Sequence, residues 1–139
     1  MRTAKPVLIV EDDDIHAATV KRALKELNVT NEIVRTANGD EALKYLENQG
    51  NKMPCVILLD LNMPKMSGIE FLKIVKSSDR LRQIPVIVMT TSDEKHDVVE
   101  SFKLGVAGYV VKPFSYKDFV EQIKIINLYW TLSELPEGE

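Results

Sequence analysis

Two kinds of segment alternate along the chain. Short runs of mostly apolar and β-branched residues occupy positions 7–10, 33–36, 55–59, 85–89 and 109–111. Runs of this length and composition favour strands that are buried on both faces of a parallel sheet. We therefore predict five strands, each followed by a longer segment of a different character.

The longer segments have the spacing of amphipathic helices. Val20, Ala23, Leu24 and Leu27 follow the pattern i, i+3, i+4, i+7, which places them on one helix face. The last helix is predicted over residues 115–129. Three pairs have an N-cap residue three positions before an acid: Asn38 and Glu41, Ser67 and Glu70, and Ser115 and Asp118. This alternation predicts one α/β domain with a doubly wound parallel sheet.

Composition narrows the class of protein. The chain has 139 residues, of which 45% are hydrophobic and 28% charged, as in an ordinary globular domain. A formal net charge of −3 argues against a nucleic-acid partner. One cysteine, Cys55, excludes an internal disulfide and a Cys-rich metal site, and we expect it to be an inert buried thiol. Of the two histidines, His16 is expected on a helix surface or at the edge of the core, and His96 on a helix surface.

The apolar runs also bear on location. The longest have four or five residues, whereas a helix that spans a membrane needs about 20. The run at residues 7–10 is too short for the core of a signal peptide. We therefore expect a cytoplasmic protein that does not enter a membrane.

Charged and hydroxyl side chains follow four of the five predicted strands. Glu11 and Asp12 follow the first, Asp60 the third, Thr90 the fourth and Lys112 the fifth. In an open α/β sheet, ligands bind beyond the carboxyl ends of the strands. We expect these five side chains to form one site.

The chemistry of this set points to a metal ion and a phosphoryl group. Two carboxylates at about 4 Å repel each other by about 4 kcal/mol at an effective dielectric constant near 20, so three need a cation beside them. Oxygen ligands suit Mg²⁺. Lys112 and Thr90 would surround a transferred phosphoryl group, and one carboxylate would act as its nucleophile. A cis bond before Pro113 would aim Lys112 inward.

Other residues at this edge have structural interpretations. Asp13 and Asp14 are expected to cap a helix and to favour its dipole. Gly68 is expected to allow close packing where a loop enters a capped helix.

Four segments together carry a family resemblance. They are LIVED at residues 8–12, LLDLNMPKMSG at 58–68, PVIVMT at 85–90 and GYVVKPF at 108–114. In this order and at these spacings, residues 5–127 resemble a response-regulator receiver domain of two-component signalling. The resemblance implies a flavodoxin-like (βα)5 fold with strand order 2-1-3-4-5.

The resemblance also implies roles for the residues of the site. Asp60 resembles the phosphoacceptor of the family. Glu11 and Asp12 resemble its acidic metal-binding pair, and Asp60 and the backbone carbonyl of Asn62 would complete the protein ligands of Mg²⁺. Because Asp is more usual than Glu at position 11, the contact of Glu11 with the metal is expected to run through water.

The remaining roles concern switching. Thr90 resembles the switch hydroxyl, Lys112 the phosphate-binding lysine, and Tyr109 the aromatic residue that changes rotamer on activation. Thr91 stands where many receivers have Ala, Gly or Ser, and its branched side chain is expected to crowd the entrance to Asp60.

Residues 128–139 follow the receiver segment and are too few for an output domain. We therefore expect a single-domain regulator. This tail is similar to the ending of regulators that pair with phytochrome-type histidine kinases. Its apolar residues, among them Tyr129, Trp130 and Leu132, predict a two-fold homodimer. The alternatives are a tail folded over its own last helix and a surface that binds the kinase.

Two further functions compete with a switch that receives its phosphoryl group from a histidine kinase. An aspartate-nucleophile phosphatase usually has a second acid two residues after the nucleophile, but this position holds Asn62. A nucleotide- or flavin-binding module needs a Gly-rich phosphate loop, and the chain has no G-x-G-x-x-G motif. The switch is the interpretation that we adopt, without enzymatic turnover of a substrate.

Overall fold

The computed structural model describes residues 5–64 and 66–134, and side chains as far as residue 126. Within this part of the chain five strands alternate with five helices, which confirms the predicted order of elements. They are β1 (Val7–Val10), α1 (Asp14–Glu26), β2 (Ile33–Thr36), α2 (Gly39–Glu47), β3 (Val56–Leu59), α3 (Gly68–Ser77), β4 (Val86–Thr90), α4 (Lys95–Lys103), β5 (Gly108–Val111) and α5 (Tyr116–Glu134).

The strands form one parallel sheet in the order β2-β1-β3-β4-β5, as the family resemblance implies. Its register determines where the site lies. Val10, the last residue of β1, is paired with Leu59, the last residue of β3. Thr90 at the end of β4 is paired with Val111 at the end of β5. The residues that follow these strands therefore leave the sheet at one edge.

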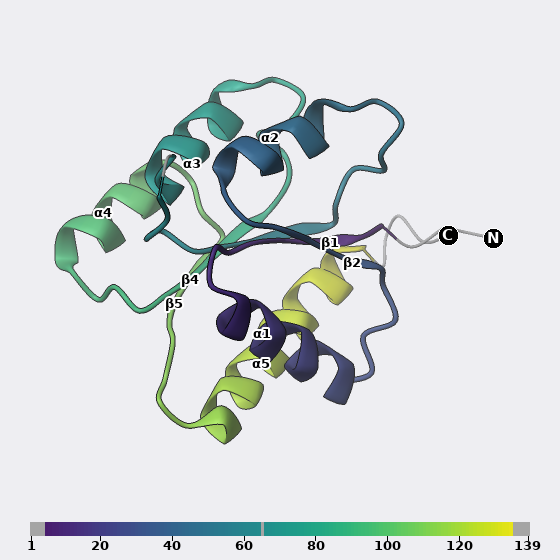
Figure 1. Ribbon diagram of the computed structural model, residues 1–139, viewed down its shortest axis with the longest axis vertical. Coiled ribbons are helices and arrows are strands. Elements are labelled where there is room, and N and C mark those ends of the chain that lie inside the picture. Colours follow the sequence, from purple (N-terminus) through teal and green to yellow (C-terminus); the bar gives the residue numbers. More distant parts are fainter. Residues whose placement is uncertain (1–4, 65, 135–139) are drawn as a thin grey trace.

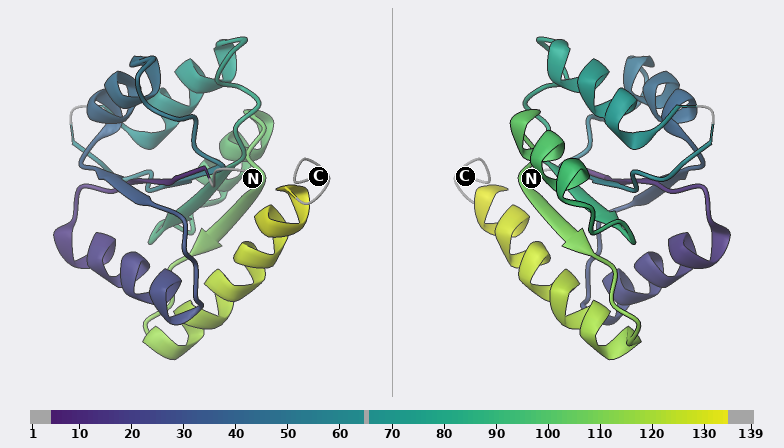
Figure 2. Two further views of the ribbon diagram at one scale, coloured as in Figure 1. Left: turned by 90° about the vertical axis from the view of Figure 1, so that its right-hand side faces the viewer. Right: turned by 90° about the vertical axis from the view of Figure 1, so that its left-hand side faces the viewer.

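Helices cover both faces of the sheet. Helices α1 and α5 lie on one face, and α2, α3 and α4 lie on the other (Figures 1 and 2). Because β1, β3 and β4 are covered on both sides, all their residues are buried, which explains their continuous apolar runs. The edge strands β2 and β5 are mostly half-buried.

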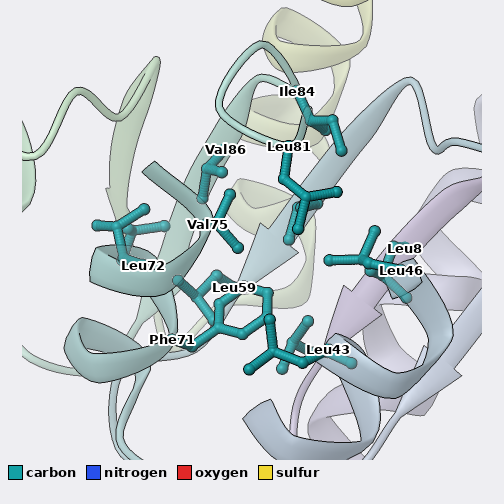
Figure 3. Close-up of a cluster of buried hydrophobic side chains, with 14 of the residues drawn as sticks. Leu8, Leu43, Leu46, Leu59, Phe71, Leu72, Val75, Leu81, Ile84 and Val86 are labelled. Atoms are coloured by element: carbon teal, nitrogen blue, oxygen red, sulfur yellow. The ribbon is translucent and has the colours of Figure 1, made fainter. Parts of the chain in front are cut away.

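The sheet separates two apolar cores. On one side Phe71, Leu72 and Val75 of α3 pack in a cluster with Leu8 of β1 and Leu59 of β3 (Figure 3). The core on the other side joins α1 and α5 to the sheet, and its members include Ile9, Leu24, Ile87, Phe119 and Ile123. Val10 and Leu59, the last residues of β1 and β3, belong to the first core, so packing fixes the strand ends that carry Glu11 and Asp60.

Side-chain caps begin several helices as the sequence predicts. Asn38 accepts a hydrogen bond from the backbone of Glu41, and Ser67 and Glu70 form a reciprocal capping box. The Ser115 hydroxyl accepts from the backbone of Asp118 at 3.3 Å. Asp13 caps α1 through the backbone N–H groups of the second and third helical residues, which confirms its expected role.

Some boundaries differ from the expectations. Strand β3 begins one residue later than predicted, β4 is shifted by one residue so that it includes Thr90, and β5 begins one residue earlier at Gly108. Helix α5 continues to Glu134, beyond its predicted end at residue 129. The peptide bond before Pro113 is trans, so a cis bond is not what directs Lys112. None of the described helices is long and apolar enough to cross a membrane.

Candidate functional site

Three carboxylates meet at the carboxyl edge of the sheet, as predicted. Oxygen atoms of Glu11, Asp12 and Asp60 lie within 4.8 Å of one another. Glu11 and Asp60 are only 3% and 6% exposed, whereas Asp12 is exposed to solvent. This cluster, called the acidic pocket below, therefore combines two buried carboxylates with one, that of Asp12, which solvent reaches.

Backbone contacts fix these acids. The Asp60 N–H donates to the carbonyl of Val10 at 3.0 Å, and the Glu11 N–H donates to the carbonyl of Thr36 at 3.0 Å. Gly68, at the start of α3, lies so close that a Cβ atom there would be 2.5 Å from the Asp60 carbonyl oxygen. The predicted close packing at Gly68 is confirmed, and it holds the segment that presents Asp60.

The electrostatics of the pocket disfavour three ionised acids. The pKa of Glu11 is raised to about 7, mainly by burial and less by the charge of Asp60, against the opposing effect of Lys112. Glu11 Oε1 accepts from Lys112 Nζ at 2.5 Å, and Oε2 accepts from the backbone N–H of Asp13 at 3.2 Å. Near neutral pH, Glu11 is poised to lose its proton when a cation enters the pocket.

Lys112 points into the site, as predicted, although the peptide bond that follows it is trans. Its side chain is only 9% exposed. Its backbone N–H donates to the carbonyl of Thr90 at 2.8 Å, which extends the β4–β5 pairing by one residue. Besides Glu11, its Nζ atom contacts His16 Nδ1 at 3.0 Å. The ammonium group thus lies between β1 and the first turn of α1.

Thr90 and Tyr109 are linked through the loop that follows β4. The fully buried Thr90 hydroxyl accepts from Asn62 Nδ2 at 3.4 Å and from the Ser92 N–H at 3.3 Å. The Tyr109 hydroxyl donates to the Ser92 carbonyl at 2.8 Å, and its half-buried ring packs against the core beside α3. A movement of Thr90 would therefore reach Tyr109 through Ser92.

Two residues of this site are absent from the sequence-based set. Arg35 of β2 donates from Nε to the Glu11 carbonyl at 2.9 Å and from Nη1 to an Asp14 carboxylate oxygen at 2.8 Å, so it anchors the loop between β1 and α1. His16, expected on a helix surface or at the edge of the core, is half-buried and contacts Lys112. The sequence places His16 in the first turn after the N-cap Asp13, but it does not show that this turn faces Lys112.

A pocket of about 500 Å³ adjoins the acidic cluster. Thr91, His16 and Lys112 line it together with Phe114, whose side chain is fully exposed. Thr91 is itself exposed, at the mouth of this pocket.

The acidic cluster fits a hard divalent cation. It offers carboxylate oxygens from three residues, two of which are buried, and Asp12 leaves the cluster open to solvent. Glu11, Asp12 and Asp60 are the residues that would hold such an ion. The side chains of Tyr129, Trp130 and Leu132 lie outside the described part of the structure, so the predicted interface stays a prediction.

Comparisons with known proteins agree with this geometry. Residues 7–124 match the family described as response regulator receiver domain. The chain is 39% identical over 127 residues to the probable methanogenesis regulatory protein FilR2 of Methanothrix harundinacea, covering 89% of this chain and 82% of that protein. It is 35% identical to the response regulator Rcp1 of Synechocystis, covering 91% and 88% of the two chains.

Solved structures show the same similarity. The Mn²⁺-bound form of Rcp1 superimposes with a TM-score of 0.84 at 35% identity, and the alignment covers 91% of this chain and 94% of that one. The phosphorylated cyanobacterial phytochrome response regulator RcpA also gives a TM-score of 0.84, at 33% identity and with 93% and 95% of the two chains covered.

Proposed function

The chain belongs to the response regulator receiver domain family, and from this membership we propose that Asp60 accepts a phosphoryl group from a histidine kinase. Receiver domains of this family act as phosphorylation-dependent switches in two-component signalling. The observation that carries the assignment is the position of Asp60. It is a buried carboxylate at a strand end, within 4.8 Å of two further acids.

The transfer is a displacement at phosphorus. A carboxylate oxygen of Asp60 forms a bond to the phosphorus atom of the donor phosphohistidine, and the P–N bond breaks with its electron pair moving to the imidazole nitrogen. The product is an acyl phosphate on Asp60. Lys112 donates an N–H to a phosphoryl oxygen, and Thr90 donates its hydroxyl to another.

We assign Mg²⁺ as the cation of the acidic pocket. Glu11, Asp12 and Asp60 would hold it with the backbone carbonyl of Asn62, and the contact of Glu11 would run through water. When bound, the ion neutralises carboxylate charge and stabilises negative charge on the phosphoryl oxygens. The oxygen-only donor set and the exposed acid Asp12, which leaves room for bound water, support Mg²⁺ over a softer metal.

Signalling would use the contacts between Thr90 and Tyr109. When the Thr90 hydroxyl turns to a phosphoryl oxygen, the hydrogen bonds that it accepts from Asn62 and from the Ser92 N–H are lost. The loop can then shift, and the hydrogen bond from Tyr109 to the Ser92 carbonyl is released. Tyr109 changes rotamer in this second state and alters the surface beside α4 for a partner.

Labelling with acetyl phosphate tests this function against the two competing ones. With Mg²⁺, the purified protein is expected to gain one phosphoryl adduct, on Asp60, whereas Asp60→Asn gains none. Asp79→Asn, a change of the same type at a side chain that is 95% exposed, is the control and should label normally. Continuous release of phosphate would indicate a phosphatase, and failure of the wild-type protein to label would contradict the phosphoacceptor assignment.

We further propose that the donor is a phytochrome-type histidine kinase and that the protein acts in the cytoplasm. The similarity to a phytochrome response regulator, RcpA, supports this partner. FilR2, which is 39% identical over 89% of this chain, is a probable methanogenesis regulatory protein, so the experiment compares kinases of different classes directly. Phosphotransfer profiling against the histidine kinases of the host would show fastest labelling by a phytochrome-type kinase. Faster labelling by another class would refute this choice of donor.

We also propose a homodimer formed through the C-terminal part of the chain. Helix α5 continues to Glu134 and has an exposed apolar side chain, Ile125. Phe102 of α4 and Val111 of β5 are exposed apolar side chains as well. Figure 2 shows α4, β5 and α5 adjacent at one side of the molecule. Deletion of residues 128–139 should shift the protein towards monomer in sedimentation equilibrium, as should replacement of Trp130 and Leu132 by Ser. A full-length monomer at about 100 μM would contradict this proposal.

A further inference from the structure

The ammonium group of Lys112 is held by two partners from different parts of the fold. Nζ lies 2.5 Å from Glu11 Oε1 and 3.0 Å from His16 Nδ1. An ammonium group only donates hydrogen bonds, so Nδ1 of His16 is the acceptor, and this assigns the imidazole the tautomer with its proton on Nε2. Two of the three N–H bonds of Lys112 are thereby fixed.

His16 is well placed to hold a flexible side chain. It lies in the first turn of α1, where its backbone N–H donates to Asp13 Oδ1 at 3.0 Å. Its side chain is 41% exposed at the rim of the pocket that Lys112 also lines. Lys112, by contrast, follows the edge strand β5 and reaches the site through four rotatable bonds. The more rigid partner in this contact is the histidine.

The hydrogen bond from Lys112 to Glu11 would be weakened when a cation binds at the site. Glu11 belongs to the acidic cluster, and a cation that enters the cluster competes with Lys112 for the same carboxylate. The hydrogen bond to His16 does not depend on that charge, because the imidazole accepts it as a neutral group. It can therefore persist when Glu11 turns towards the cation.

We propose that His16 is a positioning residue for Lys112 in phosphoryl transfer. The inference rests on the proposed function, since it assumes that Asp60 is phosphorylated. His16 takes one N–H of Lys112 and fixes the ammonium group, so that the remaining donors reach the phosphoryl oxygens above Asp60. His16 itself transfers no proton and touches no reacting atom, and its effect is on the rate of transfer rather than on metal affinity.

The experiment measures phosphorylation of Asp60 by acetyl phosphate, which requires no partner protein. The rate is followed by mass spectrometry of quenched samples, over a range of acetyl phosphate and of Mg²⁺ concentrations. His16→Ala should lower the maximal rate about fivefold, the typical effect of one lost hydrogen bond, and leave the half-saturating concentrations of donor and Mg²⁺ unchanged. His16→Asn should restore most of the rate, because its Oδ1 can accept at the place of Nδ1.

Two controls separate positioning from a general structural role. Thr19→Ala changes another residue that lines the same pocket, and it should leave the rate unchanged. In a Lys112→Ala background, replacing His16 should have no further effect, because the side chain that it positions is gone. Thermal unfolding of each variant confirms that it is folded.

The possible outcomes are distinct. A wild-type rate in His16→Ala, equally slow His16→Ala and His16→Asn variants, or an effect that persists without Lys112 would each overturn the positioning role. If the wild-type protein does not label at all, the phosphoacceptor assignment fails instead. A change confined to the half-saturating Mg²⁺ concentration would assign His16 to the metal site and would also overturn the proposal.

Discussion

Replacing Asp60 by Asn is expected to stabilise the metal-free protein even though it removes the proposed phosphoacceptor. Asp60 is buried beside Glu11, and their carboxylate oxygens lie within 4.8 Å of each other. The substitution keeps the shape of the side chain and removes one of the repelling charges. The gain should depend on pH, because the repulsion requires that Glu11 is ionised as well.

The distance between the two carboxylates gives the size of the expected gain in stability. At 4.8 Å and an effective dielectric constant near 20, two unit charges repel by about 3 kcal/mol. The rise in the pKa of Glu11 to about 7 has a similar total size, about 3 kcal/mol. Burial is the largest cause of this rise and Asp60 a smaller one. Relief from Asp60→Asn is therefore a fraction of the total, about 1–2 kcal/mol or roughly 3–6 °C in Tm.

The pKa of Glu11 also determines how the stabilisation by Asp60→Asn changes with pH. Because folding raises the pKa of Glu11, its favourable contribution to stability is complete below pH 4.5 and is lost as pH rises through about 7. At pH values below this pKa of about 7, Glu11 is mostly protonated and does not repel Asp60. The difference in Tm between Asp60→Asn and the wild-type protein should therefore be small at pH 6 and larger at pH 8.

The assay is thermal unfolding followed by circular dichroism, in EDTA, at both pH values. Asp79→Asn is the matched control, since the carboxylate of Asp79 is 95% exposed and makes only a surface ion pair with Arg82. Its Tm should stay within about 1 °C of the wild-type value. An unchanged or lower Tm for Asp60→Asn at pH 8, or an equal gain at both pH values, would refute the argument from repulsion.

Three further predictions concern the metal, the packing under the site and the switch. Mg²⁺ should raise the Tm of the wild-type protein, and Asp12→Ala should remove most of that increase, as shown by melting curves with and without the ion. Gly68→Ala should cost about 2 kcal/mol in urea unfolding, because the new Cβ atom meets backbone, whereas Gly50→Ala meets only a side chain and should cost little. Thr90→Ala should still be phosphorylated but show a smaller change in partner binding; an unchanged response would contradict its proposed link to Tyr109.

The sequence predicts the sheet well because its central strands are buried on both faces. A short, continuous apolar run such as residues 56–59 is typical of a strand that is buried on both faces of a sheet. Each of these runs is followed by an amphipathic helix. The carboxyl ends of parallel strands meet at one edge, so the sequence alone groups the residues that follow the strands. The gathering of Glu11, Asp12 and Asp60 is the clearest success of this reasoning.

Other features depend on geometry that strand positions do not determine. Whether His16 faces Lys112 depends on the phase of α1, which the cap at Asp13 sets. Arg35 interrupts an apolar run in the edge strand β2. Its contact with the Glu11 carbonyl depends on the pairing of β2 with β1, which places Arg35 opposite Ile9. The extension of α5 to Glu134 had a signal, because the first proline after the helix start is Pro136.

The charges of the site explain why cation binding and phosphoryl transfer should depend on each other. Three ionised carboxylates and Lys112 give the described cluster a net charge of −2, from three negative charges and one positive charge. A phosphoryl donor brings further negative charge and would be repelled. One divalent cation would bring the cluster to zero, and by competing for Glu11 it would also free an N–H of Lys112 for the phosphoryl oxygens. The contact between Lys112 and Glu11 is therefore expected to break as the site becomes competent, while the contact with His16 remains.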